Sequence, residues 1–338
     1  MDHTPSRGPL VTARAPLQVA VSGAAGQVGY AAVFRIASGE AFGPDQPIVL
    51  RMLEVEPVMR RLDAVAMELD DCSYPLLSDV VVTSDPGRAY HNASWVIMLG
   101  AARREAGMER SDLLAANGEI FQRHGRAIGD GASDDVRVLV VGNPCNTNCL
   151  IARSNAPEIP SDRWFAMMRL DQNRATNHLA RKAGVANGDV TNVVVWGNHS
   201  ATQYPDALNA RVAGRPAMDV IDVDWLRDDF QRLVGQRGAA VIEARGASSA
   251  ASAAKAVIDS VQSIQTPTPR GEFVSLAVNS HGEHGVPEGL QFGFPVETLD
   301  SGCAVVENID VDEFGRTMLQ RNIDELEAER TSVAHLLP

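Results

Sequence analysis

Residues 17–29 read LQVAVSGAAGQVG, an apolar run that leads into a turn containing three glycines. The apolar run at residues 17–22 predicts a buried β-strand, and the pattern after the turn predicts a helix over residues 28–37. A strand that enters a helix through a tight glycine turn is the opening unit of an α/β fold with a parallel sheet.

The glycines of this turn match part of a dinucleotide-binding fingerprint. Gly26 and Gly29 occupy its last two glycine positions, while the first position holds Ala24, with Gly23 directly before it. Glycine lets a diphosphate approach the backbone, and the start of the following helix offers unpaired N–H groups. The turn therefore predicts a dinucleotide site, although many tight strand-to-helix turns bind nothing.

The next part of the chain repeats the same alternation of strand and helix. Further apolar runs predict strands at residues 48–54, 80–83, 94–99 and 136–141, and helical patterns lie at residues 57–72 and 111–124. Continuous Val, Ile and Leu runs are typical of strands buried on both faces. We therefore expect a doubly wound parallel sheet covered by helices on both sides.

The pattern changes after about residue 157. Helices are predicted at residues 171–184, 224–246, 247–265 and 310–331, and strands at residues 190–196, 273–278 and 290–294. We expect a second, mixed α+β domain, with residues 1–16 as a loose tail, 17–157 as the first domain and 158–338 as the second.

Composition excludes several classes of protein. The 338 residues include 30 Lys and Arg against 43 Asp and Glu, a net charge of −13, which argues against nucleic acid as the main partner. No apolar run approaches the roughly 20 residues that cross a bilayer, and residues 1–16 lack the apolar core of a secretory signal. Four cysteines are too sparse for a disulfide framework, so a reduced cytoplasmic enzyme fits best.

Glu54 ends the second predicted strand, where it can select the cofactor. A carboxylate at this place accepts hydrogen bonds from both adenosine-ribose hydroxyls and repels a 2′-phosphate. The alternative is a solvated glutamate at a strand end. The position favours NAD over NADP.

Several polar residues follow other strands and could carry chemistry. A loop rich in arginine, residues 101–110, follows one strand, and Asn143 follows the next. Asp171 and Arg174 are three residues apart and share one face of a predicted helix, and His199 follows the strand at residues 190–196. Taken singly, each has an ordinary reading: a solvated surface, a turn signal, a helix cap with an ion pair, or a structural histidine.

Together these motifs resemble malate dehydrogenase of the cytosolic type, in the lactate/malate dehydrogenase superfamily. The resemblance runs in order from about residue 18 to residue 296 and rests on GAAGQVGY, MELDDCSYPLL, RREAGMERSDLLAANGEIF, VVGNPCNTN, RLDQNRA, WGNHSATQYPD, ARGASSAASAA and GVPEGLQFGFPV. It implies a Rossmann domain followed by a catalytic domain, NAD as the cofactor, malate and oxaloacetate as substrates, and a homodimer.

The resemblance also assigns roles to individual residues. His199 matches the proton acceptor and Asp171 the carboxylate that orients it, while Arg174 matches the arginine that grips the carboxylate next to the reacting carbon. Arg104 and Arg110 match the loop arginines that bind the dicarboxylate, and Asn143 matches a residue that touches substrate and nicotinamide. The matched cofactor contacts are Gly23, Ala24, Ala25, Gly26, Gln27, Val28, Gly29, Glu54, Asn117, His124, Val141, Gly142 and Asn143.

The chemistry of malate oxidation agrees with these roles. A base with a pKa near neutrality removes the hydroxyl proton best, and histidine has such a pKa. Guanidinium groups bind carboxylates bidentately, so Arg104 is the surplus cation that selects a second carboxylate, where lactate-specific relatives usually carry glutamine. A lactate or other 2-hydroxyacid dehydrogenase and a non-catalytic NAD-binding module remain as alternatives.

Three places depart from the family pattern. His124 stands where relatives often have glutamine, Lys255 replaces a usual asparagine, and residues 281–284, HGEH, replace a Ser-Asp-Gly stretch. The two histidines of that stretch lack a third ligand at metal-binding spacing, and we expect no metal. Cys145 and Cys149 are expected to be reduced, buried thiols.

Overall fold

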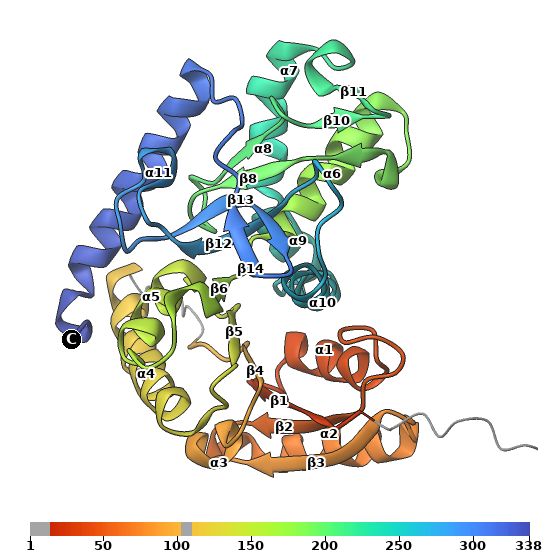
Figure 1. Cartoon of the computed structure of the whole chain (residues 1–338), viewed down its shortest axis with the longest axis vertical. Helices are drawn as coiled ribbons and strands as arrows, with labels where there is room; N and C mark the ends of the chain where they lie inside the picture. Colours follow the sequence, from red (N-terminus) through yellow and green to blue (C-terminus); the bar gives the residue numbers. More distant parts are fainter. Residues whose placement is uncertain (1–13, 103–109) are drawn as a thin grey trace, which may run out of the picture.

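The computed structural model describes residues 14–102 and 110–338 (Figure 1). A parallel sheet forms its first half, in the spatial order β3-β2-β1-β4-β5-β6. Its strands are β1 (Leu17–Ser22), β2 (Ile48–Leu53), β3 (Leu77–Thr83), β4 (Trp95–Met98), β5 (Arg137–Val140) and β6 (Trp164–Ala166). The strand order reverses beside β1, so the predicted doubly wound sheet is confirmed.

Helices cover both faces of this sheet because its strands are apolar on both sides. Val19 and Val21 of β1 face the core shared with α1 (Gln27–Ala37) and α2 (Met59–Cys72), whereas Ala20 faces the opposite core. That second core is shared with α3 (Pro86–Tyr90), α4 (Arg110–Gly131) and α5 (Cys145–Ser154). Full burial of each large apolar side chain contributes about 1.5–3 kcal/mol.

The second half of the chain extends the same sheet with antiparallel strands. β12 (Val274–Asn279) pairs with β6, and β13 (Gln291–Leu299) and β14 (Gly302–Val305) follow outward. The long helices here are α6 (Arg169–Ala183), α10 (Ala251–Gln265) and α11 (Glu313–Ser332). In Figure 1, α10 lies beside α1, and α11 runs along the edge of the molecule toward α5. The predicted mixed second half is present.

Two predicted elements are broken in the structure. The expected strand at residues 190–196 is two short strands, β7 (Val190–Thr191) and β8 (Val194–Trp196), because Asn192 adopts φ +58° and its amide donates to the Gly271 carbonyl at 2.9 Å. The expected helix at residues 224–246 is three helices, α7 (Val223–Arg227), α8 (Asp229–Gly235) and α9 (Arg237–Arg245). Here α8 buries apolar side chains against the core, whereas α9 buries none, so the two helices pack differently on the protein.

The remaining elements are short. Small strands β9 (Tyr204–Asp206), β10 (Arg211–Val212) and β11 (Arg215–Pro216) complete two minor sheets with β8 and β7. Single 3₁₀ turns lie at Glu56–Val58, Ser161–Arg163, Asn187–Asp189, Ala217–Asp219, Glu283–Gly285 and Ala334–Leu336. In the described part of the chain, no helix has the length and apolar character needed to span a membrane.

Candidate active site

The glycine turn lies at the carboxyl edge of the sheet, at the point where the strand order reverses. The Gly26 N–H donates to the Gly23 carbonyl at 3.0 Å, which closes the turn after β1. Gly23 has φ +69°, and a Cβ there would lie 2.6 Å from the backbone nitrogen of Gly100, which follows β4. Only glycine therefore lets the loops after β1 and β4 pack this closely.

The start of α1 suits a bound diphosphate. Gly26 is the N-cap residue, and it supplies no side-chain hydrogen bond to the first turn. The backbone N–H groups there and the positive end of the helix dipole favour an anion. A turn that a Cβ would fill and an uncapped helix start are both features that a dinucleotide requires, so these residues fit the cofactor.

Glu54 reaches the same turn from the end of β2. Its Oε1 accepts a hydrogen bond from the Ala25 N–H at 3.1 Å, and its Oε2 accepts one from the Val55 N–H at 3.3 Å. The predicted acid and the predicted glycine turn are thus brought into contact.

Asn117 ties together the two loops that follow β4 and β5. Its Oδ1 accepts from the Ala102 N–H at 2.7 Å, and its amide donates to the Asn143 carbonyl at 3.5 Å. The N–H groups of Val141 and Gly142 both donate to the Met98 carbonyl, at 2.9 and 3.0 Å. The predicted contacts at residues 117 and 141–143 therefore share one edge of the sheet with the glycine turn.

His124 lies among aromatic side chains. Its Nδ1 lies 2.5 Å from the Tyr90 hydroxyl, and the Tyr90 ring meets its ring edge-to-face. Burial, with a smaller effect of Arg123, lowers the pKa of His124 to about 4, so the ring is neutral at physiological pH. Tyr90 also interacts with Ser22, the residue before the glycine turn, which links His124 to the back of that turn.

Asp171, Arg174 and His199 form one cluster. Asp171 lies in the first turn of α6 and is 0% exposed, and its Oδ2 pairs with Nδ1 of His199, which follows β8. Arg174, one turn further along α6, donates to the other carboxylate oxygen at 3.0 Å. Two segments far apart in the sequence, the start of α6 and the loop after β8, meet here. Nδ1 of His199 is engaged by Asp171, so Nε2 is the ring nitrogen that can act on a substrate.

The pKa values of this cluster are set by opposing effects. Burial alone would lower the pKa of His199, but the charge of Asp171 and its hydrogen bond outweigh burial and raise it above the ordinary value. Burial alone would raise the pKa of Asp171, but His199 and Arg174 outweigh it and lower it. The carboxylate therefore stays ionised and stabilises the imidazolium form of His199, an arrangement that suits a general base.

Three further side chains hold this cluster that sequence reasoning missed. Gln203, with its amide nitrogen turned toward Asp171, donates to both carboxylate oxygens at 3.2 and 3.1 Å. Asn146 accepts from the His199 N–H at 3.0 Å. The Ser249 hydroxyl accepts from Arg174 at 3.4 Å. Gln203 and Asn146 lie inside motifs that carry the family resemblance. Their position beside the predicted site residues in those motifs was the signal by which the sequence could have identified them.

The predicted arginine loop is only partly covered. Arg104 lies outside the described residues. Arg110 begins α4, and its side chain is not described. The structure thus leaves the two predicted dicarboxylate-binding arginines as predictions.

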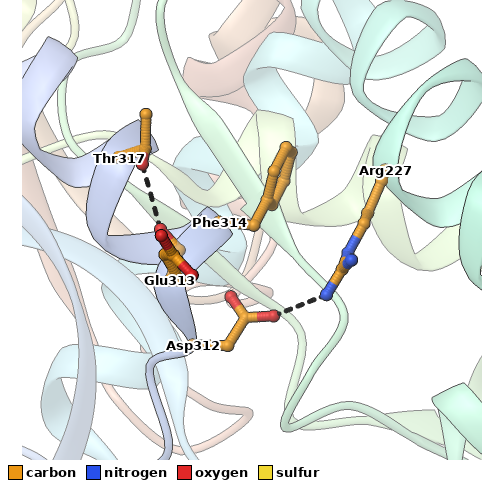
Figure 2. A pocket seen from close by; sticks show the side chains of 5 residues that line it. All are labelled: Arg227, Asp312, Glu313, Phe314 and Thr317. Carbon is orange, nitrogen blue, oxygen red and sulfur yellow. Dashed lines mark hydrogen bonds and ion pairs between the residues drawn. The ribbon is translucent and has the colours of Figure 1, made fainter.

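Two cavities in the described part of the chain lie away from this cluster. One, of about 400 Å³, lies at the start of α11. Figure 2 shows that Arg227 points toward Asp312 there. A second, of about 200 Å³, lies beside α6 and β12. Neither is lined by His199 or the glycine turn. Within residues 14–102 and 110–338, no group of three or more His, Cys, Asp and Glu side chains is placed to hold a metal ion.

His281, His284, Cys145 and Cys149, which the sequence analysis singled out, lie outside this cluster and make contacts within the protein. The Nε2–H of His284 donates to the Val306 carbonyl at 2.9 Å, and the His284 ring packs against Trp196. His281 contacts the Asn279 amide at 3.3 Å. Cys145 and Cys149 are buried free thiols, and burial raises the pKa of each.

Comparison with known families covers nearly the whole chain. Residues 17–165 match the lactate/malate dehydrogenase NAD binding domain, and residues 168–337 match the lactate/malate dehydrogenase α/β C-terminal domain. These matches agree with the fold described above, a Rossmann sheet followed by an α/β domain.

Solved structures agree with these matches. The chain is 40% identical to malate dehydrogenase from Naegleria fowleri, with a TM-score of 0.92, covering 96% of this chain and 99% of that one. It is 34% identical to Trichomonas vaginalis lactate dehydrogenase in complex with NADH and oxamate, with a TM-score of 0.91, covering 95% and 99%. Malate dehydrogenase from Salinibacter ruber, at 22% identity and a TM-score of 0.79, shares the fold. The chain therefore belongs to the lactate/malate dehydrogenase family of NAD-dependent 2-hydroxyacid dehydrogenases.

Proposed function

We propose that this protein is a malate dehydrogenase that interconverts (S)-malate and oxaloacetate with NAD. The observation that carries the proposal is the pairing of His199 with the buried carboxylate of Asp171, with Arg174 on the same helix face. When bound, NAD supplies the group that accepts the hydride from C2 of malate. The glycine turn after β1 and Glu54 would hold its diphosphate and its adenosine ribose.

The residues of the cluster carry out proton transfer and substrate binding. His199 takes the proton of the C2 hydroxyl, and Asp171 holds the imidazole in one tautomer and stabilises its cation. Arg174 binds the carboxylate next to C2 through its planar guanidinium fork. Asn143 is the proposed contact to substrate and nicotinamide.

Selection of a dicarboxylate is assigned to Arg104 and Arg110. The support is the family resemblance of the RREAGMER segment, because a second carboxylate on the substrate requires a second cation in the pocket. An arginine left unpaired by lactate or pyruvate penalises those monocarboxylates.

A lactate dehydrogenase is the second candidate. A specific observation favours it: the Trichomonas vaginalis relative at 34% identity is a lactate dehydrogenase and matches this chain over nearly its full length. Substrate preference between the two therefore depends on the arginine loop. From the family resemblance we also propose that the protein works as a homodimer. From the change of sequence pattern after about residue 157 we propose that its two domains are residues 17–157 and 158–338.

The test compares oxaloacetate with pyruvate in a spectrophotometric assay of NADH oxidation. We expect a higher kcat/KM for oxaloacetate, and Arg104→Gln should lower that value at least about tenfold while sparing pyruvate. Arg211→Gln is the matched control, because Arg211 is an exposed arginine on β10 that bonds the Gly214 carbonyl. A higher kcat/KM for pyruvate in the unaltered protein would overturn the assignment to malate.

A further inference from the structure

α11 presents a polar stripe at positions where a packed helix would ordinarily be apolar. Asn322, Glu325 and Glu329 follow one another at spacings of three and four residues, which places them on one helix face. Asn322 is 0% and Glu329 4% exposed, while Glu325 is half-buried. Buried polar groups are unfavourable unless they form hydrogen bonds, so this stripe requires partners.

The partners lie in the loop that carries His199, residues 197–203, here called the His199 loop. Asn322 accepts from the Asn198 N–H at 2.9 Å and donates to the Thr202 carbonyl at 2.7 Å. These two hydrogen bonds hold the backbone of the loop in place on both sides of His199.

The two glutamates bind side chains of the same loop. Oε2 of Glu325 accepts from the Asn198 amide at 3.0 Å, from the Ser200 hydroxyl at 2.6 Å, and from the Thr202 hydroxyl. Oε1 of Glu329 accepts from the Asn198 amide at 3.0 Å. The residues directly before and after His199 are therefore both bound to α11.

The first residues of α11 are themselves held in place by contacts with the rest of the protein. Asp312 caps the helix by accepting from the Gly315 N–H at 2.7 Å, and Arg227 pairs with Asp312 at 2.9 Å (Figure 2). The ring of Phe314 packs edge-to-face against Tyr204, at the other end of the His199 loop. A helix held at its start can act as a rigid support for the loop that it binds.

We propose that Asn322, Glu325 and Glu329 are positioning residues, which hold the His199 loop so that the imidazole meets Asp171. They act through the loop, since their bonds described above end on residues 198, 200 and 202. The inference rests on the proposed function in one respect, that His199 is the proton acceptor. Misplacing a reacting group by about 1 Å can cost about a hundredfold in rate.

The test replaces Glu325 and follows the His199 ring itself. Within residues 14–102 and 110–338, the charged groups facing that ring are Asp171 and Arg174, and contact with Asp171 raises the pKa of His199. In Glu325→Ala, we expect the His199 titration midpoint, followed by NMR of the imidazole nitrogens, to fall by about half a unit or more. The His199 signal is identified by its loss in His199→Gln. The kcat/KM for oxaloacetate should fall about tenfold or more, with NADH affinity unchanged.

Two companion variants separate positioning from general stability. Glu325→Gln keeps one carbonyl oxygen that can take the place of Oε2, so it should restore most of the midpoint and the activity. Leu326→Ala, at the next residue of α11, removes a buried side chain from the apolar core. It should lower the melting temperature without moving the His199 midpoint.

Each result decides the proposal. An unchanged midpoint in Glu325→Ala, or an equal fall in Leu326→Ala, would overturn it. If Glu325→Ala does not fold, Thr202→Val removes a hydroxyl that donates to Glu325 from the loop side and should give a smaller fall of the same sign. If the unaltered protein turns over neither oxaloacetate nor pyruvate, the proposed function fails, while the NMR titration still reports whether α11 positions His199.

Discussion

Gly197 and Asn322 lie so close together that no side chain fits between them. Gly197 has φ +90°, and a Cβ built on it would overlap the amide of Asn322. Its backbone N–H and carbonyl also pair with Gly293, at 3.0 and 2.8 Å. The loop that carries His199 therefore begins at a residue fixed by β13 on one side and by α11 on the other.

Gly197→Ala should both destabilise the protein and remove its activity. The positive φ and the overlap with Asn322 together are expected to lower the free energy of unfolding by about 2–5 kcal/mol. Gly184→Ala is the matched control, because Gly184 has φ +72° with no atom within 4 Å of the added Cβ. It should lose only about 1–2 kcal/mol and keep its turnover. Urea unfolding and NADH oxidation measure the two effects, and equal losses in the two variants would contradict the overlap.

Asp171→Asn should shift the pH profile to lower pH. Asp171 raises the pKa of His199, so its loss lowers that pKa. As the proposed base of malate oxidation, His199 must be unprotonated, so kcat/KM is expected to rise as pH increases through its pKa. We therefore expect the acid limb of the profile to move to lower pH, and kcat to fall about a hundredfold or more because the imidazolium loses its counter-charge.

The control for this variant makes the same chemical change elsewhere. Asp259→Asn alters a buried aspartate that bonds Lys255 and Asn173 rather than His199. Its acid limb should stay in place. If Asp171→Asn lowers activity but the acid limb of its pH profile stays at the same pH, a group other than His199 determines the pH dependence of kcat/KM.

The sequence was most informative where a residue follows a strand. The rule that parallel strands end at one edge of a sheet placed Asn143, and the dinucleotide fingerprint placed Glu54, whereas His199 was identified only by the family resemblance. The structure brings Glu54 onto the glycine turn and His199 onto Asp171. The roles of the individual residues came from the family resemblance and remain predictions.

The support behind His199 was not visible in the sequence. Asn322 accepts from the N–H of Asn198, which lies 124 residues earlier in the chain. The sequence predicted only that Asn322 lies in a long, charged helix. A single sequence shows periodicity along a helix but does not show which distant loop the helix face meets. The break at Asn192 was missed for a similar reason, because its left-handed conformation is matched by a bond to Gly271, 79 residues away.

Glu54→Gln should weaken the discrimination between NADH and NADPH. The Glu54 carboxylate accepts from the Ala25 N–H at 3.1 Å, which places its charge at the glycine turn, where the adenosine ribose is proposed to bind. Loss of the charge removes hydrogen bonds to the ribose hydroxyls and the repulsion of a 2′-phosphate, so the ratio of kcat/KM for NADH to that for NADPH should fall about 10- to 100-fold. Glu56→Gln is the control, because Glu56 is an exposed carboxylate two residues away that bonds the Ser84 hydroxyl. A ratio that falls equally in both variants would mean that general negative charge near the turn, rather than Glu54, selects the cofactor.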